Sequence, residues 1–281
     1  MPNYGYHLAR AQAKAVRAVY RAFLPSIARR RISGRVDVPF SVFSYSGEST
    51  LPEQVASIRS FLKYVGRPRK FTVVSDGTLS ARSIVILKSL NCVVANSAQW
   101  LPKGLPANAY PYLTNHPTGK QLALIMSLPV DGPALYVDSD VLFFPGARQL
   151  QMGLEGVGAP ASYLADCRLS ADERLLRGDG ERAHPVNTGV LVLFEKLDWA
   201  LALRRFLELQ GPPEFFTNQT MTHLTMHANG ALPLDSRRYV LQLDDQFVYG
   251  DHYASNDLVL RHYVNPVRHK FWTTIARRIR C

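Results

Sequence analysis

The chain has 281 residues, is 47% apolar and carries a formal charge of +11, so it can bury a substantial core and does not have the composition of a disordered chain. The charge is unevenly spread, because residues 1–35 hold eight basic residues and no acid, and residues 261–281 hold six more and again no acid. Basic ends of this kind indicate an anionic partner. Nucleic acid, an anionic membrane surface and a phosphorylated substrate all remain candidates.

The cysteines and the apolar runs bear on where the protein works. Three cysteines, Cys92, Cys167 and Cys281, are an odd number without metal-type spacing, which favours a reducing compartment. Basic residues interrupt the first apolar run, so no signal peptide is expected, and no run approaches the roughly 20 apolar residues that span a bilayer. We expect a cytoplasmic protein, and a peripheral contact with an anionic membrane stays open.

Residues 8–24 predict an amphipathic helix that Pro25 closes, followed by a linker over residues 27–35. We therefore expect a basic extension over residues 1–35 and a main domain over residues 36–281. The apolar side of the helix can pack on its own domain or dock on a membrane surface. The helix has a basic face and an apolar face: Arg10, Lys14, Arg17 and Arg21 on the first, and Leu8, Val16, Val19 and Phe23 on the second.

Strand and helix patterns alternate through the first half of the main domain. This alternation is typical of βαβ units, which build an α/β fold around a parallel sheet with its ligands beyond the carboxyl ends of the strands. The expected strands are 38–45, 71–77, 92–95 and 134–137, and the expected helices are 51–66, 81–90 and 119–129.

The segment 134-ALYVDSDVLFFPG-146 places Asp138 and Asp140 in the most apolar part of the chain, with Ser139 between them. If Val137 ends a central strand, both carboxylates emerge at its carboxyl end and point the same way. Two carboxylates side by side repel each other, and a shared divalent cation with open positions for phosphate oxygens relieves that repulsion. The pair therefore predicts a site for a cation and a diphosphate.

This pattern resembles the Asp-X-Asp signature of the GT-A glycosyltransferases, which transfer a sugar from a nucleotide diphosphate donor to an acceptor. The segment 186-VNTGVLVLFEKLDW-199 is similar to the Asn-Thr-Gly segment of glycosyltransferase family eight, which includes glycogenin and bacterial lipopolysaccharide galactosyltransferases. The resemblance implies a GT-A, Rossmann-like fold with a mixed, mostly parallel sheet flanked by helices. It also implies that Asn187, Thr188 and Gly189 bind the donor, with the asparagine reaching the donor sugar.

Two later segments extend the resemblance to residues 38–272. In 216-FTNQTMTHL-224, Asn218 stands where the family has an aspartate that contacts the sugar, while Gln219 is retained, and these two are the implied catalytic residues. In 261-RHYVNPVRHKFW-272, the resemblance implies that His262 completes the metal site. Arg268 or Lys270 would then meet the diphosphate, Arg in bidentate fashion and Lys as a point charge.

The resemblance implies a metal-dependent transferase that uses Mn2+ or Mg2+ and a donor that we expect to be a UDP-sugar, with retention of configuration. Two further residues are candidates for the donor site, each with a structural alternative. Tyr45 ends the first strand and could stack on uracil or pack in the core, and Lys120 could reach the phosphates or be a solvated lysine. The sequence offers Asp166, Asp244 and Asp245 as spare acids but assigns no catalytic base, and residues 244–246 could serve an acceptor or form a turn. It leaves the acceptor open as a glycan, a glycolipid or a protein.

Three other functions compete with this interpretation, and one of them, a degenerate transferase that binds a nucleotide without turnover, is suggested only by Asn218. A sugar-nucleotide nucleotidyltransferase can share the fold, but such enzymes carry a Gly-rich loop with a basic residue after the first strand, and residues 44–50 have one glycine and no basic residue. A nonenzymatic nucleic-acid-binding module would use the basic termini, yet the sequence contains no recognisable nucleic-acid-binding motif. We therefore expect no nucleic-acid partner.

Overall fold

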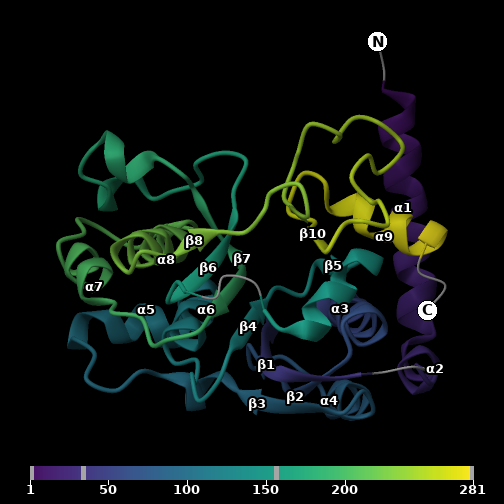
Figure 1. The fold of residues 1–281 in the computed structure, drawn as a ribbon, viewed down its shortest axis with the longest axis horizontal. Coiled ribbons are helices and arrows are strands. Elements are labelled where there is room, and N and C mark those ends of the chain that lie inside the picture. The colour runs from purple at the N-terminus through teal and green to yellow at the C-terminus, as the bar shows by residue number, and fades with distance from the viewer. Residues whose placement is uncertain (1–2, 33–35, 155–157, 279–281) are drawn as a thin grey trace.

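The computed structural model describes residues 3–32, 36–154 and 158–278, and a seven-stranded sheet forms its centre (Figure 1). The strand order is β3-β2-β1-β4-β7-β6-β8. Neighbours from β3 to β4 are parallel, whereas β7 is antiparallel to β4 and β6, so the expectation of a mixed, mostly parallel sheet is confirmed. The strands are β1 (Asp37–Ser46), β2 (Arg67–Ser75), β3 (Cys92–Asn96), β4 (Ala134–Val137), β6 (Ala161–Ala165), β7 (Val186–Leu193) and β8 (Leu232–Pro233).

A second, three-stranded sheet follows directly from the centre of the first. Its order is β5-β10-β9, formed by β5 (Val141–Phe143), β10 (Leu260–His262) and β9 (Tyr239–Val240). β10 is antiparallel to β5, with His262 opposite Val141. Because Val141 follows Asp140 in the chain, this register brings the end of β10 beside the turn that leaves β4.

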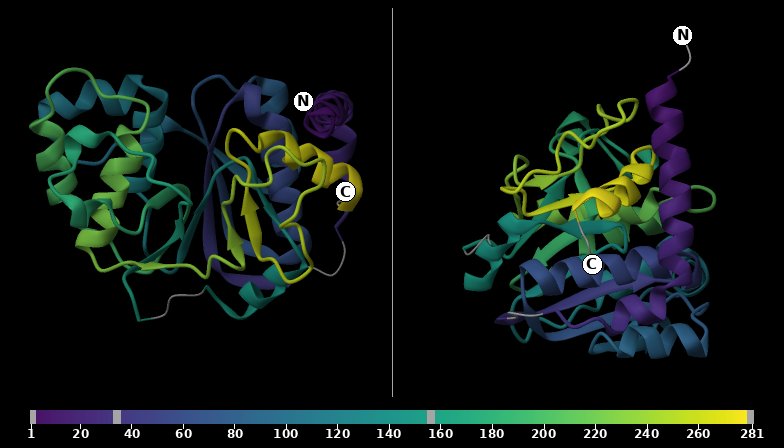
Figure 2. Two further views of the ribbon diagram at one scale, coloured as in Figure 1. Left: turned by 90° about the horizontal axis from the view of Figure 1, so that it is seen from above. Right: turned by 90° about the vertical axis from the view of Figure 1, so that its right-hand side faces the viewer.

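Helices cover both faces of the large sheet (Figures 1 and 2). Side chains alternate between the faces, as pleating requires: Val42 enters one core cluster and Phe43 the other. The core cluster on one face takes in residues of α2 (Leu24–Arg29), α3 (Leu51–Tyr64) and α4 (Ala81–Lys88), and α1 (Tyr4–Ala22) and α9 (Arg268–Arg278) join the same cluster. The other face packs on α5 (Tyr110–Asn115), α6 (Pro117–Met126), α7 (Ala200–Leu207) and α8 (Thr217–Ala228).

Helix α1 stands at one edge of the molecule beside α9, and its first turns project past the body (Figures 1 and 2). The predicted apolar face does not pack on the domain as a whole: Leu8, Val19 and Phe23 are each about 60% exposed, and only Val16 packs against the core. The helix instead turns two alanines and one tyrosine inward, and the small alanine side chains allow a close approach to the body. Its buried residues are Ala9, Ala13 and Tyr20, and the Tyr20 ring lies 5.1 Å from that of Trp272.

The predicted linker over residues 27–35 is also partly wrong. The chain forms α2 over Leu24–Arg29, where Pro25 occupies the first turn of a new helix instead of closing the region. Residues 33–35 lie outside the described part of the chain.

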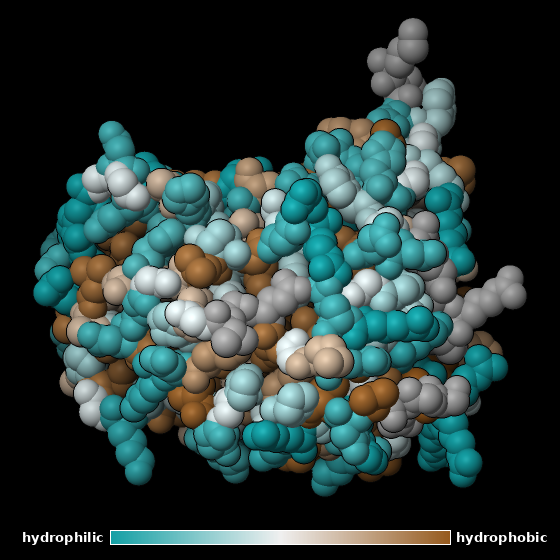
Figure 3. All heavy atoms as spheres, viewed as in Figure 1, coloured by the Kyte–Doolittle hydropathy of each residue, from teal (hydrophilic) through white to brown (hydrophobic). Residues whose placement is uncertain are grey.

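The helices that the structure describes are all too short or too polar to cross a membrane. On the face seen in Figure 3, hydrophobic residues lie in separate groups among hydrophilic ones. That face therefore presents no single continuous apolar patch of the kind that marks an interaction surface.

Candidate functional site

A pocket of about 560 Å³ opens where β1 and β4 end, at the carboxyl edge of the parallel part of the sheet. This is the edge at which α/β folds bind their ligands. Segments far apart in the sequence meet there, from β1 to the start of α9. Most of the predicted site residues line it: Tyr45, Asp138, Ser139, Asp140, Asn187, Thr188, Asn218, Gln219, His262 and Arg268.

Asp138, Asp140 and His262 form one cluster at this pocket. Nε2 of His262 lies 3.0 Å from Oδ1 of Asp140 and 3.6 Å from Oδ2 of Asp138. One ligand atom from each residue can be chosen so that all three lie within 4.8 Å of one another. Asp140 and His262 are buried, and Asp138 is half-buried. Both carboxylates face the same point, as the sequence predicted, although β4 ends at Val137 and the acids lie in the turn that follows it.

The environment of His262 fixes the direction of its ring. Oδ1 of Asn187 accepts a hydrogen bond from the backbone amide of Gly189 at 2.9 Å. This bond identifies the side-chain atom beside the ring as the oxygen and not the nitrogen of Asn187. Nδ1 of His262 lies 2.9 Å from the same oxygen and must donate to it. In the neutral imidazole, Nε2 then directs its lone pair at the carboxylates. That arrangement requires a proton or a cation between the nitrogen and the two acids.

The residues fit a divalent cation. An ion held at about 2.0–2.3 Å from each ligand would need ligand atoms no more than about 4.6 Å apart, close to the spread in the structure. Carboxylate oxygens suit Mg2+ and Mn2+, and an imidazole nitrogen suits the transition metals, so the mixed set favours Mn2+ over Mg2+. The hydrogen bond from Nδ1 to Asn187 is the outer contact that metal-binding histidines usually make.

The two carboxylates have opposite pKa shifts. Burial raises the pKa of Asp138, and the nearby charge of Asp140 raises it further, against the lowering effect of His262. Burial also acts to raise the pKa of Asp140, but His262 and Arg268 outweigh it and lower that pKa to about 2. Asp140 is therefore the more strongly anionic member of the pair. Nη2 of Arg268 lies 2.6 Å from its second oxygen.

Arg268 and Lys270 have different surroundings, although the sequence left either as a phosphate contact. Arg268 lines the pocket with about half of its side chain exposed. Lys270 does not line it, so the prediction that Lys270 meets phosphate is wrong. Two residues along α9 turn a side chain by about 200°, which directs the lysine to the opposite side of the helix.

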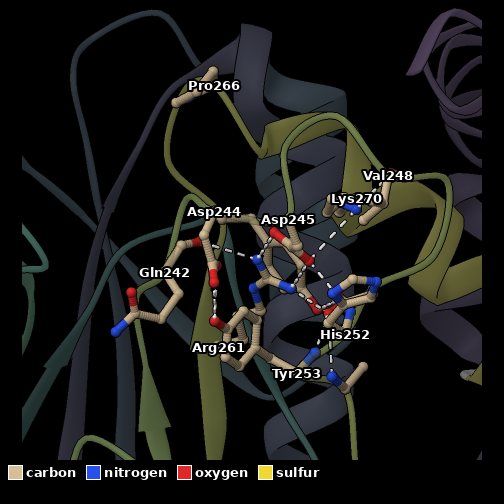
Figure 4. A network of polar contacts seen from close by, with 12 residues as sticks. Gln242, Asp244, Asp245, Val248, His252, Tyr253, Arg261, Pro266 and Lys270 are labelled. Atoms are coloured by element: carbon tan, nitrogen blue, oxygen red, sulfur yellow. Dashed lines mark hydrogen bonds and ion pairs between the residues drawn. The ribbon is translucent and has the colours of Figure 1, made fainter. Parts of the chain in front are cut away.

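The ammonium of Lys270 is fully buried in a separate polar network (Figure 4). It donates to the carbonyls of Val248 and Gly250 at 2.9 and 2.5 Å and lies 3.4 Å from Asp245. Arg261 forms the centre of this network, with Nη2 2.8 Å from Oδ1 of Asp245. The sequence left residues 244–246 open as an acceptor contact or a turn, and Asp245 has a structural role that fixes the 242–252 loop.

Tyr45 and Lys120 lie at the side of the pocket next to β2. Tyr45 lines the pocket and its hydroxyl has no hydrogen-bond partner within the described residues. Burial raises the pKa of that hydroxyl, and the charge of Asp76 adds to the shift. Lys120 does not line the pocket. Its Nζ donates to the carbonyl of Asp76 at 3.1 Å. Asp76 lines the pocket, so Lys120 supports a lining residue and is not itself a lining residue.

The sequence analysis did not assign two polar side chains that organise this pocket. Asp166, noted only as a spare acid, accepts hydrogen bonds at 3.1 Å from the amide groups of both Asn187 and Gln219. Gln121 was missed, because a glutamine inside a helix pattern carries no signal. Its Nε2 donates to Oδ1 of Asp138 at 2.8 Å, and its Oε1 accepts from Nδ2 of Asn218 at 2.9 Å.

Comparison with solved structures reveals the same fold in several enzymes. The galactosyltransferase LgtC, in complex with donor and acceptor sugar analogues, superposes with a TM-score of 0.56 at 14% identity, over 84% of this chain and 95% of that chain. Mouse xyloside xylosyltransferase 1 gives a TM-score of 0.53 at 13% identity, over 83% and 99%. GlyE of Streptococcus pneumoniae gives 0.51 at 13% identity, over 84% and 60%.

No protein-family model matches the sequence, and no curated protein matches it. The similarity is therefore one of fold. The expectation of a GT-A fold that the motif resemblance implied is confirmed at this level. The chain has the fold of the GT-A glycosyltransferases.

Proposed function

We propose that the protein is a metal-dependent glycosyltransferase that transfers a sugar from a nucleotide diphosphate donor, a UDP-sugar, to a glycan, glycolipid or protein acceptor with retention of configuration. The observation that carries this proposal is the cluster of Asp138, Asp140 and His262 at the pocket. A cation held there would neutralise charge on the departing nucleoside diphosphate. The solved structures that share the fold are a galactosyltransferase, a xylosyltransferase and a glycosyltransferase, which supports the transferase part of the proposal.

Arg268 has the position to bind the departing phosphate. Its guanidinium is half-exposed in the pocket and lies beside Asp140, so it can turn from that carboxylate to a phosphate oxygen without being desolvated first. Paired hydrogen bonds from a guanidinium to phosphate are strong and directional. Tyr45 lines the same pocket at the end of β1, where its ring could stack on a uracil base.

Asn218 and Gln219 would contact the donor sugar. Both begin α8, and Asp166 holds the Gln219 amide at 3.1 Å, which fixes the direction of its oxygen. Asn218 is an amide and cannot accept a proton, so it cannot serve as a base. Asp166 already accepts two amide hydrogen bonds, and Asp244 accepts one from Tyr253 at 2.7 Å. A retaining reaction, in which the leaving phosphate takes the proton, agrees with this set of groups.

The proposal is tested with a panel of UDP-sugars and Mn2+. We expect slow hydrolysis of one donor by the protein, and proton NMR of the first product should show the anomeric configuration of the donor. Asp140→Asn should abolish the reaction, whereas Asp131→Asn, which removes an exposed carboxylate at the opposite end of β4, should not change it. Hydrolysis that is equal in both variants would contradict the proposal.

The same panel separates the alternative functions. Turnover of a nucleoside triphosphate with a sugar phosphate, without cleavage of any UDP-sugar, would favour a nucleotidyltransferase. The loop after β1 supports the transferase instead, because residues 46–50 contain no basic group that could hold a triphosphate. Binding of nucleic acid without binding of any nucleotide would favour the nonenzymatic alternative.

A further inference from the structure

A second pocket, of about 460 Å³, lies between α1 and the start of α9. Its lining is unusually basic for a chain whose middle region is nearly neutral. Cationic side chains from two elements converge on it, three from α1 and one from α9: Arg10, Lys14, Arg17 and Arg268.

The acid that lines this pocket is already neutralised. Glu53 is 5% exposed and receives two hydrogen bonds from Arg17, at 2.5 and 3.0 Å. Nε1 of Trp272 donates to the same carboxylate at 3.0 Å. Arg17 and Glu53 therefore form a compensated pair in the wall. The pair adds no net charge to the pocket and cannot balance the other cations.

Arg10 and Lys14 remain without acidic partners among the described residues. Both are exposed and stand one helical turn apart on the same side of α1. Nη1 of Arg10 reaches the hydroxyl of Tyr6 at 3.2 Å, and its guanidinium lies 5.3 Å from the ring of that tyrosine. These contacts hold the arginine in place and leave its charge uncompensated. The pocket thus presents two free positive charges to whatever enters it.

The second pocket adjoins the donor pocket at two points. Arg268 and Asn265 line both of them. Arg17 lines the second pocket and donates through Nη2 to the carbonyl of Ser49 at 2.5 Å, and Ser49 lines the donor pocket. A molecule held beside Arg10 and Lys14 therefore lies next to Arg268, at the end of the donor pocket where the phosphates are expected.

We propose that this second pocket binds a phosphate group of the acceptor, held by Arg10 and Lys14, while the sugar of that acceptor extends past Arg268 into the donor pocket. The proposal rests on the proposed glycosyltransferase function. The cation ligands line the first pocket and not the second, so the donor diphosphate and this phosphate occupy separate places. The phosphate can belong to a phosphorylated sugar or to a lipid headgroup, which share the same chemistry.

The test uses inorganic phosphate as a probe, titrated by calorimetry at low ionic strength into protein saturated with UDP and Mn2+. The double variant Arg10→Gln/Lys14→Gln should bind phosphate about tenfold more weakly or worse, because two charge-assisted contacts are lost. A control with the same net charge, Lys103→Gln/Arg148→Gln, changes exposed residues outside the pocket and should stay within about twofold of wild type. Equal weakening in both variants, or no binding by wild type, would overturn the proposal.

Sedimentation with vesicles identifies the source of the phosphate. Phosphatidylcholine vesicles that contain phosphatidylglycerol should bind the wild type and release the double variant if the phosphate belongs to a lipid. Phosphate binding that depends on Arg10 and Lys14, without vesicle binding, would assign it to a phosphorylated sugar.

Titration of UDP into the same variants separates this proposal from the function on which it rests. We expect UDP affinity within about twofold of wild type in both double variants, because neither changes the donor pocket. A loss of UDP affinity in Arg10→Gln/Lys14→Gln that matches the loss of phosphate affinity would make the pocket part of the donor site and overturn the acceptor assignment. If the wild type binds no UDP, phosphate is titrated into the protein alone. Phosphate affinity that still depends on Arg10 and Lys14 would then support an anion site in this pocket, without a link to glycosyl transfer.

Discussion

The imidazole of His262 lies directly over Gly189, so a Cβ atom at position 189 would overlap the ring. Gly189 is thus required by sterics, since the ring that faces the two aspartates occupies the space of its missing side chain. The resemblance placed this glycine among the donor-binding residues, yet it does not line the pocket. Its role in the structure is to let His262 approach β7.

Gly189→Ala tests this packing. The added methyl group should displace the imidazole from Asp138 and Asp140 and weaken Mn2+ binding by about tenfold to a hundredfold, as loss of a ligand's support usually does. Titration of Mn2+ monitored by electron paramagnetic resonance measures the effect. Gly178→Ala is the matched control, because nothing lies within 4 Å of a Cβ atom there. Unchanged Mn2+ affinity in Gly189→Ala would show that the ring position does not matter.

Asn187 positions His262 and is a separate test. Its Oδ1 holds Nδ1 of the ring at 2.9 Å, so Asn187→Ala should leave both aspartates in place and still weaken Mn2+ binding by about tenfold or more. Asn187→Asp keeps the acceptor, but its second oxygen would face the carboxylate of Asp166, so the double variant Asn187→Asp/Asp166→Asn should restore much of the affinity. If Asn187→Ala and the double variant bind Mn2+ equally, the hydrogen bond does not orient the ring.

Arg268 and Lys270 should separate binding from stability. Arg268→Gln removes a half-exposed guanidinium from the pocket and should weaken UDP binding by about tenfold with little change in the free energy of unfolding. Lys270→Met leaves Asp245 with less compensation in a buried network and should destabilise the protein by about 3–5 kcal/mol. Urea unfolding measures the free energy of unfolding of both variants, and calorimetric titration of UDP measures their affinity. The reverse pattern would place the phosphate contact at Lys270.

Asn218→Asp tests why this chain has an amide where the related family has an acid. Nδ2 of Asn218 donates to Oε1 of Gln121, whose own Nε2 donates to Asp138 at 2.8 Å. A carboxylate at position 218 would face that oxygen, and turning Gln121 would direct the oxygen at Asp138 instead. We expect a loss of about 1–3 kcal/mol in stability for one unsatisfied pair. Asn108→Asp, at an exposed position, is the control. A variant as stable as wild type would show that the amide chain is not needed.

Acid should destabilise the fold through Asp245. Burial acts to raise the pKa of this carboxyl, but Arg261 and Lys270 outweigh it, so the pKa lies below its ordinary value of 3.8. A lowered pKa in the folded protein contributes stability above about pH 4, which is lost as the pH falls through the lowered value. Urea unfolding from pH 6 to pH 2.5 measures this loss. In Asp245→Asn the dependence should be shallower, and an identical slope would exclude Asp245 as its source.

The sequence predicted the parts of the site that depend on strand order. Asp138 and Asp140 follow an apolar strand. In α/β folds the carboxyl ends of the central parallel strands lie at the ligand-binding edge of the sheet, so the position of the two acids could be predicted. His262 could be added only through the resemblance, because nothing local in the sequence indicates that β10 pairs with β5. The fold class followed from alternating patterns, whereas short strands such as β6 and β10, with five and three residues, were not predicted.

The sequence could not show which face of a helix is buried, or which side chains from distant segments contact each other. The sequence shows which residues of α1 share a face, but only packing decides which face is buried, and the alanines were buried in place of Leu8 and Phe23. Lys270 is basic and near the motif, yet its position on α9 directs it into the network around Arg261. Gln121 acquires its role only from contacts with Asn218 and Asp138, which no single-residue pattern records.

Calorimetric titration of UDP, with and without Mn2+, into the wild type and Asp140→Asn decides whether the cluster of Asp138, Asp140 and His262 is a donor site. Asp140 faces both His262 and Arg268, so its loss should remove the cation and with it the diphosphate contact. We predict binding that requires Mn2+ in the wild type and is lost in the variant, with Asp131→Asn unchanged. UDP that binds equally with and without Mn2+, or equally to wild type and Asp140→Asn, would contradict the account.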